Sequence, residues 1–133
     1  MTGRDTASTG LAAEAAACRF LEAHGLATVT RNYRCRLGEI DLVMRDGREL
    51  VLVEVRYRRN ATQVHPYVTV TAQKQRRILR AAQHLLLRNP KLAGAGLRFD
   101  VVAVTGDLAA PRFEWLRAGF DATGIASDRR QRL

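Results

Sequence analysis

The sequence EIDLVMRDGRELVLVEVRYR, residues 39–58, contains two apolar runs separated by Asp46-Gly47. Asp-Gly between two apolar runs is a strong short-range signal for a β-hairpin. The second run is apolar at every position from 50 to 53, which is typical of a strand that is covered on both faces. Glu54 follows inside this run, where burial would cost its charge several kcal/mol unless a partner compensates. The sequence therefore predicts a buried hairpin that carries an acidic group with a partner.

The position of the turn decides which side chains of the hairpin share a face. A turn centred on the Asp-Gly dipeptide pairs Asp41 with Leu52 and Glu39 with Glu54. Paired residues project from the same face, and a slip of one residue would send Asp41 and Glu54 to opposite faces. The predicted charged face carries Glu39, Asp41, Glu54 and Arg56 beside Val43, Leu50 and Leu52, and the other face carries Ile40, Leu42, Val51, Val53 and Val55.

Residues 9–25 are expected to form the first helix. Thr9 is a suitable N-cap, and Gly25 is a suitable end. The apolar stripe of this helix consists of Leu11, Ala15, Cys18 and Leu21. Glu14 lies on the same stripe, so its side chain is expected to face inward.

The remaining elements complete an α/β fold around a mixed sheet. A first strand is expected at 26–33 and two later strands at 97–105 and 112–117. A second helix is expected at 71–90, with Thr71 as its N-cap and Asn-Pro at its end. The order of elements is α-β-β-β-α-β, followed by a short final strand.

A chain of 133 residues fits one domain. We expect a flexible leader at 1–8, a single domain at 9–120 that includes a polar loop at 59–70, and a basic, disordered tail at 121–133. No apolar stretch approaches the ~20 residues of a membrane span, and the N-terminus has no secretory h-region. The two cysteines have no CxxC spacing, which suits a reducing cytoplasm.

The charge of the chain favours a polyanionic partner. Lys and Arg number 22 against 13 Asp and Glu, which gives a formal net charge of +9 and a sequence pI of about 10.9. Such values are in the range of nucleic-acid binders, although general solubility in a protein from a GC-rich genome is the alternative. The second predicted helix has five basic residues and no acids, so we expect either DNA contact or a solvated face. These five are Lys74, Arg76, Arg77, Arg80 and Arg88.

The acidic face of the hairpin predicts a cation site. Carboxylates as close as Asp41 and Glu54 cannot all stay ionised without a cation or shared protons. Mg²⁺ is the natural partner, because it is hard and is held by one or two carboxylates together with waters and substrate phosphates. With a basic surface nearby, this combination suggests phosphodiester hydrolysis. The alternative is a structural ion pair between Glu54 and Arg36 or Arg56.

Four further stretches carry a family resemblance together with the hairpin. They are GxxAE at 10–14, RNYRCRLGEIDL at 31–42, VTAQKQRRI at 70–78 and RFDVVAV at 98–104. From Gly10 to Phe120 the chain resembles the YraN-type family of bacterial proteins. That family is placed in the PD-(D/E)XK endonuclease-like superfamily, near the archaeal Holliday-junction resolvases. The resemblance implies a restriction-endonuclease-like core, with a central mixed β-sheet flanked by helices.

The resemblance also implies a metal site, position by position. The metal-binding aspartate of the superfamily falls on Asp41, and its second acid falls on Glu54, whose neighbour Val55 would offer a carbonyl to the metal. The glutamate of the first helix falls on Glu14, which the apolar stripe also turns inward. These residues would hold Mg²⁺ or Mn²⁺. Similarity to dimeric resolvases implies a homodimer by analogy.

Arg56 occupies the position of the lysine in the superfamily motif. Arginine stays protonated, so it can clamp a phosphate but cannot act as a general base. Lys74 on the second helix is a candidate substitute.

Two functions follow from these patterns. The first is a Mg²⁺- or Mn²⁺-dependent endonuclease on structured, branched DNA, in which Arg56 or Lys74 manages phosphate charge and the second helix grips the backbone. The alternative is a nucleic-acid-binding module on a nuclease fold whose cleavage is weakened or lost. A scaffold without a DNA role is the third reading, and it predicts that removal of Lys74, Arg76, Arg77 and Arg80 leaves DNA affinity unchanged.

Overall fold

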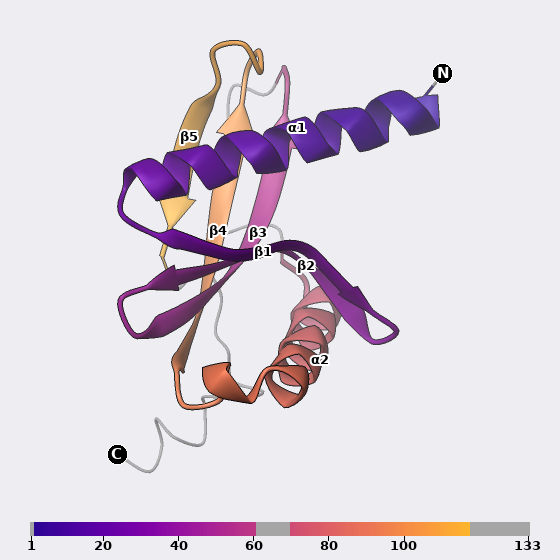
Figure 1. Cartoon of the computed structure of the whole chain (residues 1–133). Helices are drawn as coiled ribbons and strands as arrows, with labels where there is room; N and C mark the ends of the chain where they lie inside the picture. Colours follow the sequence, from indigo (N-terminus) through magenta and orange to yellow (C-terminus); the bar gives the residue numbers. More distant parts are fainter. Residues whose placement is uncertain (1, 61–69, 118–133) are drawn as a thin grey trace.

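The chain folds around a five-stranded sheet with the strand order β1-β2-β3-β4-β5 (Figure 1). The computed structural model describes residues 2–60 and 70–117, with side chains from residue 8 onward. Neighbouring strands are antiparallel except β3 and β4, which are parallel. The strands are β1 (Ala27–Cys35), β2 (Gly38–Asp46), β3 (Glu49–Arg58), β4 (Gly96–Thr105) and β5 (Arg112–Leu116), and the helices are α1 (Thr2–Ala23), α2 (Ala72–Arg88) and the short 3-10 helix η2 (Pro90–Leu92). The predicted α/β class and order of elements are confirmed, and they are consistent with a restriction-endonuclease-like fold.

The two long helices cover opposite faces of the sheet, which explains the apolar run of β3. Val51 and Val53 pack toward α1, whereas Leu50 and Leu52 pack toward α2. All four are at most 1% exposed, and burial of each such side chain stabilises the fold by about 1.5–3 kcal/mol. The α1 cluster also contains Ala17, Cys18, Leu21, Leu42, Met44 and Val102, and the α2 cluster also contains Val43, Ile78, Leu79, Leu85 and Phe99.

The first helix starts earlier than the sequence predicts. α1 begins at Thr2, so Thr9 lies inside the helix and its predicted N-cap role is wrong. No proline interrupts residues 2–9, so the backbone can continue the helix past Thr9. Leu11 is also misplaced by the prediction, because it is 50% exposed. The buried face of α1 consists of small side chains, Cys18 and Leu21, which lets the helix lie close to the sheet.

The other predicted helix ends are confirmed. α1 ends at Ala23, and Gly25 follows with φ +97°, a left-handed conformation that suits glycine. Thr71 caps α2, and its hydroxyl oxygen accepts a hydrogen bond from the Lys74 N–H at 3.1 Å. α2 ends just before Pro90, as the Asn-Pro pair predicts.

The register of the hairpin is shifted by two residues from the prediction, which is therefore wrong. Asp46 pairs with Glu49, so Gly47 and Arg48 form the turn. Gly47 has φ +61°, which glycine adopts without a Cβ clash. The paired ends are joined by Arg98, whose Nη1 lies 2.9 Å from a carboxylate oxygen of each acid. An even shift keeps most side chains on their predicted faces, so the acidic face survives.

Arg98 is the centre of an ion-pair cluster on this side of the sheet. Its Nη2 also lies 3.0 Å from Oδ2 of Asp100, which is fully buried. The Trp115 Nε1–H donates a further hydrogen bond to Asp100 at 2.9 Å. Burial alone would lower the pKa of Arg98, but its hydrogen bonds to the surrounding acids raise it above the usual value. Arg98 and Trp115 therefore hold Asp100 in a structural role.

Two predicted segments fall outside these elements. Most of the predicted loop at 59–70 and the whole predicted tail at 121–133 lie outside the described residues. The division into leader, domain and tail stays a prediction. Between residues 2 and 60 and between 70 and 117, no helix is long and apolar enough to cross a membrane.

Candidate functional site

Asp41 lies at a break in the sheet. In the β1–β2 ladder Arg31 pairs with Leu42, and Tyr33 pairs with Ile40. The pair between them, Asn32 with Asp41, is missing from the ladder. The β2–β3 ladder starts one residue later, with Leu42 opposite Val53. Here the Val55 N–H donates a hydrogen bond to Oδ2 of Asp41 at 2.8 Å. The Asp41 carboxyl group thus replaces a main-chain acceptor at the point where β2 leaves β3.

This break moves one side chain to a face that the sequence does not predict. Ile40 packs in the α2 cluster together with Val43, although a regular strand would place these two residues on opposite faces. The prediction that Ile40 shares a face with Leu42 is therefore wrong. The irregular backbone around Asp41 is the physical reason.

Glu54 is buried and faces two cations. Its side chain is 5% exposed, and its Oε2 lies 2.6 Å from Lys74 Nζ and 3.4 Å from Arg56 Nε. Arg56 belongs to the same strand, whereas Lys74 comes from the first turn of α2. Of the two arginines that the sequence offers as structural partners, Arg56 is in place. Lys74 adds a second cation that arrives from a different element.

Glu14 reaches the same region from α1. Burial raises the pKa of its carboxyl group, and the neighbouring side chains of Asp41 and Asn32 lower it. Its Oε1 is buried and has no hydrogen-bond partner among the described residues. Glu14 thus faces inward, as its place on the helix predicts, and it joins Asp41 and Glu54 in an acidic cluster. By contrast, Glu39 is exposed and forms an ion pair of 3.8 Å with Arg34.

The three carboxyl groups of the acidic cluster have raised pKa values. Burial is the largest cause at each of them, because it disfavours the charged form. The pKa of Glu54 rises to about 7, since burial and the charge of Asp41 outweigh the effect of Lys74. The pKa of Asp41 rises to about 6, since burial and the neighbouring Glu14 outweigh the hydrogen bond from the backbone. The acidic cluster therefore keeps its protons to higher pH than exposed carboxyl groups do.

The acidic cluster offers oxygen ligands for a hard cation, but its side chains do not form a complete coordination site. Within residues 2–60 and 70–117, no three His, Cys, Asp or Glu side chains are arranged to hold a metal ion together. Mg²⁺ needs only one or two protein carboxylates, because waters and substrate phosphates complete its shell. The free oxygen of Glu14 and the raised pKa values of Asp41 and Glu54 fit such an ion.

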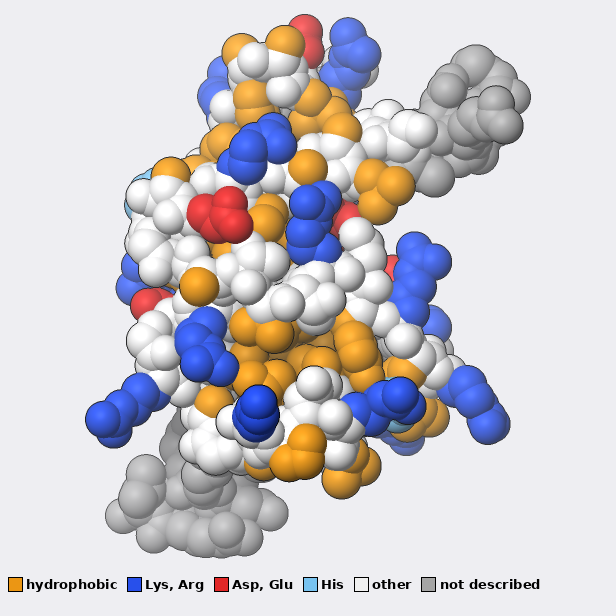
Figure 2. Space-filling view, viewed as in Figure 1, with side chains coloured by type: hydrophobic (Ala, Val, Ile, Leu, Met, Phe, Trp, Pro, Cys, Tyr) orange, Lys and Arg blue, Asp and Glu red, His pale blue; other side chains and the backbone are white. Residues whose placement is uncertain are grey.

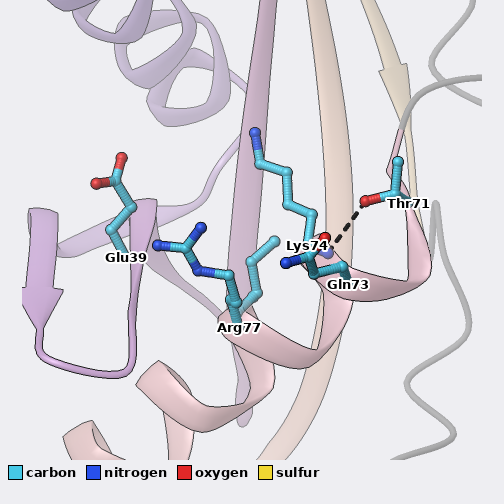
Figure 3. A pocket seen from close by; sticks show the side chains of 6 residues that line it. Glu39, Thr71, Gln73, Lys74 and Arg77 are labelled. Carbon is cyan, nitrogen blue, oxygen red and sulfur yellow. Dashed lines mark hydrogen bonds between the residues drawn. The ribbon is translucent and has the colours of Figure 1, made fainter.

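A pocket of about 420 Å³ lies beside the acidic cluster, between the start of β2 and the N-terminus of α2. In Figure 3 the Lys74 side chain extends from α2 along β3, and the Arg77 side chain points toward Glu39. Lys74 therefore belongs both to the pocket and to the Glu54 ion pair. The pocket is lined by Glu39, Thr71, Gln73, Lys74, Arg77 and Ile78.

The four predicted DNA-binding residues are all exposed on α2, but they divide into two pairs. Lys74 and Arg77 line the pocket, whereas Arg76 and Arg80 lie outside it. The helix is seated closely on the sheet, since a Cβ at Gly38 would come within 2.3 Å of the Arg77 carbonyl oxygen. On the face shown in Figure 2, Lys and Arg side chains surround an area of hydrophobic side chains.

Two features of the site, Asn32 and the position of Lys74 beside Glu54, were not predicted from the sequence. Asn32 has φ +53°, a left-handed conformation that asparagine tolerates better than most residues. The available signal was an asparagine inside a predicted strand, where it is normally depleted. The meeting of Lys74 with Glu54 depends on how α2 crosses the sheet, which no local pattern encodes.

The fold and the site together define a class of protein. It is an α/β protein of restriction-endonuclease-like topology, in which an acid of the first helix lies near acids of two adjacent strands. Within this class, residues 13–104 match the model of the uncharacterised protein family UPF0102. The match spans more than half of the chain, and the protein belongs to this family. The resemblance to the YraN-type family is thereby confirmed.

Relatives that are named UPF0102 protein align along most of the chain. One from Chromohalobacter salexigens is 49% identical over 121 residues, which cover 91% of this chain and 97% of the relative. One from Nitrosococcus oceani is 46% identical over 111 residues, which cover 84% of this chain and 90% of the relative. One from Methylococcus capsulatus is 44% identical over 122 residues, covering 92% and 98%. These names state a family and no activity, so the function has to follow from the site.

Proposed function

We propose that the protein is a metal-dependent nuclease that hydrolyses phosphodiester bonds in structured DNA. The observation that carries this proposal is the convergence of Glu14, Asp41 and Glu54 from three elements beside the ammonium group of Lys74. Buried acids with raised pKa values next to a pocket are typical of functional sites. A basic protein with such a site is suited to a phosphate-containing polymer.

The acidic cluster is proposed to bind the metal ion. Asp41 and Glu54 supply carboxylates from adjacent strands, and Glu14 supplies the free oxygen from α1. When bound, Mg²⁺ or Mn²⁺ would supply Lewis-acid stabilisation of the phosphate oxygens and lower the pKa of a bound water. Loss of the protons from Asp41 and Glu54 precedes full ligation, because a protonated carboxyl group is a poor ligand.

Lys74 is proposed to replace the lysine of the superfamily motif. Arg56 holds the motif position on β3, and its guanidinium group cannot give up its proton at working pH. The Lys74 ammonium reaches the same Glu54 oxygen from α2 at 2.6 Å. With Glu54 among the residues that would hold the metal ion, the Lys74 ammonium would be available to bind a phosphate oxygen and stabilise its negative charge. Arg56 then clamps the phosphate.

α2 is proposed to contact the DNA backbone. Its first three turns carry exposed basic side chains and no acids. The positive end of the helix dipole points to the same side, so a phosphate would relieve the repulsion among these cations. We expect affinity to fall steeply with salt, since each neutralised phosphate releases counterions. The basic residues concerned are Lys74, Arg76, Arg77 and Arg80.

The alternative is a DNA-binding module on a nuclease fold with weakened or lost cleavage. Its support is the arginine at the motif position, since Arg56 lies 3.4 Å from Glu54 and Lys74 lies 2.6 Å from the same oxygen. In this reading, the two cations stabilise Glu54 as a structural ion pair. DNA binding then needs no metal ion.

The test is a cleavage assay on labelled duplex, flap, single-stranded and four-way-junction DNA with Mg²⁺ or Mn²⁺. The variants are Asp41→Ala, together with Asp41→Asn, which keeps an acceptor oxygen for the Val55 N–H. Glu22→Gln is the matched control, because Glu22 is an exposed acid on α1. The nuclease predicts that the unsubstituted protein and Glu22→Gln cut, and that neither Asp41 variant does.

The other outcomes separate the alternatives. Retarded but uncut DNA with all of these proteins would favour the binding module. A protein in which Lys74, Arg76, Arg77 and Arg80 are all glutamine should bind DNA far more weakly and with a smaller salt dependence. Unchanged DNA affinity in that variant would contradict any DNA role of α2.

A cytoplasmic location and a homodimer are further parts of the proposal. Cys18 and Cys35 are free thiols, which suits a reducing compartment. The homodimer rests on analogy with resolvases, whose two-fold substrates match a two-fold enzyme. Light scattering coupled to gel filtration would measure the oligomeric state.

A further inference from the structure

The hairpin formed by β1 and β2 extends beyond the rest of the sheet. β2 pairs with β3 only from Leu42 onward, whereas β1 and β2 stay paired as far as Cys35 and Gly38. The part of β2 before Leu42 therefore forms a two-stranded ribbon with β1. Figure 1 shows the turn of this ribbon at the edge of the molecule, beside α2. A two-stranded ribbon is narrow enough to enter a groove of DNA.

The ribbon is held against α2. A hydrogen bond joins the Tyr33 hydroxyl group to Nδ1 of His84, and Tyr33 and Cys35 pack against the α2 cluster. A Cβ added at Gly38 would lie 2.3 Å from the Arg77 carbonyl oxygen, so the two main chains are in close contact. The turn of the ribbon therefore has a fixed place beside the basic residues of α2.

The turn consists of residues that hairpins do not favour. Arg36 and Leu37 form it, between the paired residues Cys35 and Gly38. Two-residue hairpin turns prefer Asn-Gly and similar pairs, because their backbone takes positive φ. Neither Arg36 nor Leu37 has a positive φ, and the Leu37 side chain is 48% exposed. A turn that departs from the favoured sequence and exposes an apolar side chain indicates a role in binding rather than in folding.

Positive charge surrounds the exposed leucine. Arg36 is exposed next to it, and the Arg34 side chain is 70% exposed. Arg34 lies 3.8 Å from Glu39, but an exposed pair of this kind contributes little to stability. Both guanidinium groups can therefore bind phosphates. Proteins that unstack DNA combine basic side chains with an apolar wedge that enters between base steps.

We propose that Leu37 is such a wedge: it enters DNA at a branch point and packs on an unpaired base, while Arg34 and Arg36 bind the flanking phosphates. The exposure of Leu37 and the contact of the ribbon with α2 stand on the structure, and the use of Leu37 on DNA rests on the proposed function. A branch point suits the wedge because its bases are already partly unstacked, so insertion costs less there than in a continuous duplex. Leu37 would thus give the protein its preference for branched DNA.

The test uses a four-way junction that carries 2-aminopurine beside the branch point, and a continuous duplex that carries the same base. Fluorescence and gel retardation are measured in EDTA, which prevents metal-dependent cleavage. The unsubstituted protein should raise the fluorescence of the junction, because 2-aminopurine brightens when it loses its stacking partner. Leu37→Ser should still bind through α2 but should leave the fluorescence close to that of the free junction.

Affinity gives a second readout. Leu37→Ser should lose about tenfold in affinity for the junction, as expected when one leucine side chain no longer leaves water, and should bind the duplex as before. Leu37→Met keeps an apolar side chain and should retain the rise in fluorescence. Leu87→Ser is the control, because Leu87 is 82% exposed in the last turn of α2 and should have no effect. Both leucines are exposed, so equal melting temperatures should confirm that the variants fold.

The other outcomes separate the wedge from the proposed function. An equal rise in fluorescence with Leu37→Ser and with the unsubstituted protein would overturn the wedge. Retarded DNA without any rise in fluorescence would also overturn it, and the proposed nuclease would stand. If the unsubstituted protein retarded neither the junction nor the duplex, the wedge and the proposed function would fall together.

Discussion

The sheet carries two groups of acidic side chains, and they differ in how their charge is balanced. In the Arg98 group, three carboxylates each lie within 3.0 Å of one guanidinium. In the acidic cluster, Glu54 has two cations, but Glu14 keeps a buried oxygen without a partner among the described residues. The Arg98 group is complete with its own side chains. The acidic cluster leaves a buried carboxylate oxygen unpaired among the described residues, and we propose that a cation binds there.

Protonation shows the same contrast. Hydrogen bonds to its acids raise the pKa of Arg98, so its guanidinium group stays protonated. In the acidic cluster, burial and mutual repulsion raise the pKa of Asp41 to about 6 and that of Glu54 to about 7. The charges of the Arg98 group are paired with one another in the folded protein. The carboxyl groups of the acidic cluster hold their protons to higher pH than exposed carboxyl groups do, and the proposed metal ion would replace these protons.

The largest expected effect is the loss of the cation in the Arg98 group. Arg98→Met should lower the free energy of unfolding by about 3–5 kcal/mol, because breaking a buried ion pair leaves acid charge uncompensated. Urea unfolding at pH 7 measures this, with Arg112→Met at an exposed position of β5 as the control. A loss below about 1 kcal/mol would show that the Arg98 group contributes little to the stability of the fold.

The next effect concerns the seat of α2, which brings Lys74 to the acidic cluster. Gly38→Ala places a Cβ 2.3 Å from the Arg77 carbonyl oxygen, so the helix has to shift. We expect a loss of about 1–3 kcal/mol, as for other overpacked positions. Gly94→Ala is the control, since a Cβ there meets nothing within 4 Å. Equal stability of the two variants would contradict the close seating of α2.

The pH dependence of stability should come from the acidic cluster. Asp41 and Glu54 bind protons more tightly when folded than at their ordinary pKa values of 3.8 and 4.5. Unfolding therefore releases protons, and the free energy of unfolding in EDTA should fall as the pH rises from about 4 to about 7. Asp41→Asn should be more stable than the unsubstituted protein at pH 7.5, by about 1–2 kcal/mol, and no more stable at pH 4. Parallel stability curves for the two proteins would refute this assignment.

The smallest effect on stability is expected at Lys74. Its side chain is 46% exposed, so Lys74→Gln should change the free energy of unfolding by less than about 1 kcal/mol. Because the ammonium competes with a metal ion for Glu54, this variant should bind Mn²⁺ more tightly and yet cleave DNA more slowly. Lys91→Gln is the matched control, since Lys91 is the other lysine of the chain. Cleavage at the normal rate in Lys74→Gln would exclude Lys74 as the replacement for the motif lysine.

Much of the fold could be predicted because local patterns encode it. The continuous apolar run of β3 identified a strand buried on both faces, and Thr71 and Gly25 marked helix ends through their own backbone preferences. The turn was placed one residue too early, which shifts the pairing by two residues; Arg98, distant in sequence, ties Asp46 to Glu49. The start of α1 was misplaced because Thr9 is a suitable N-cap residue but also fits inside the helix, which begins at Thr2.

The acids of the candidate site could be predicted from the sequence. The groups that contact these acids could not. Spacing alone turned Glu14 inward, and an even register error left Asp41 and Glu54 on one face. The break at Asp41 was not predictable, because it depends on a backbone hydrogen bond from Val55. Nor was the meeting of Lys74 with Glu54, since it is set by the packing of α2 on the sheet. Local patterns thus identify which groups exist, and tertiary packing decides which of them meet.

The most direct test of the central claim is thermal unfolding at pH 7.5 with increasing Mn²⁺. An ion that binds only the folded protein stabilises it by about 2.7 kcal/mol at 100 times its dissociation constant. The account predicts a rising melting temperature for the unsubstituted protein and for Glu22→Gln, and a much smaller rise for Asp41→Asn. No rise in the unsubstituted protein, or an equal rise in Asp41→Asn, would contradict a metal site at the acidic cluster.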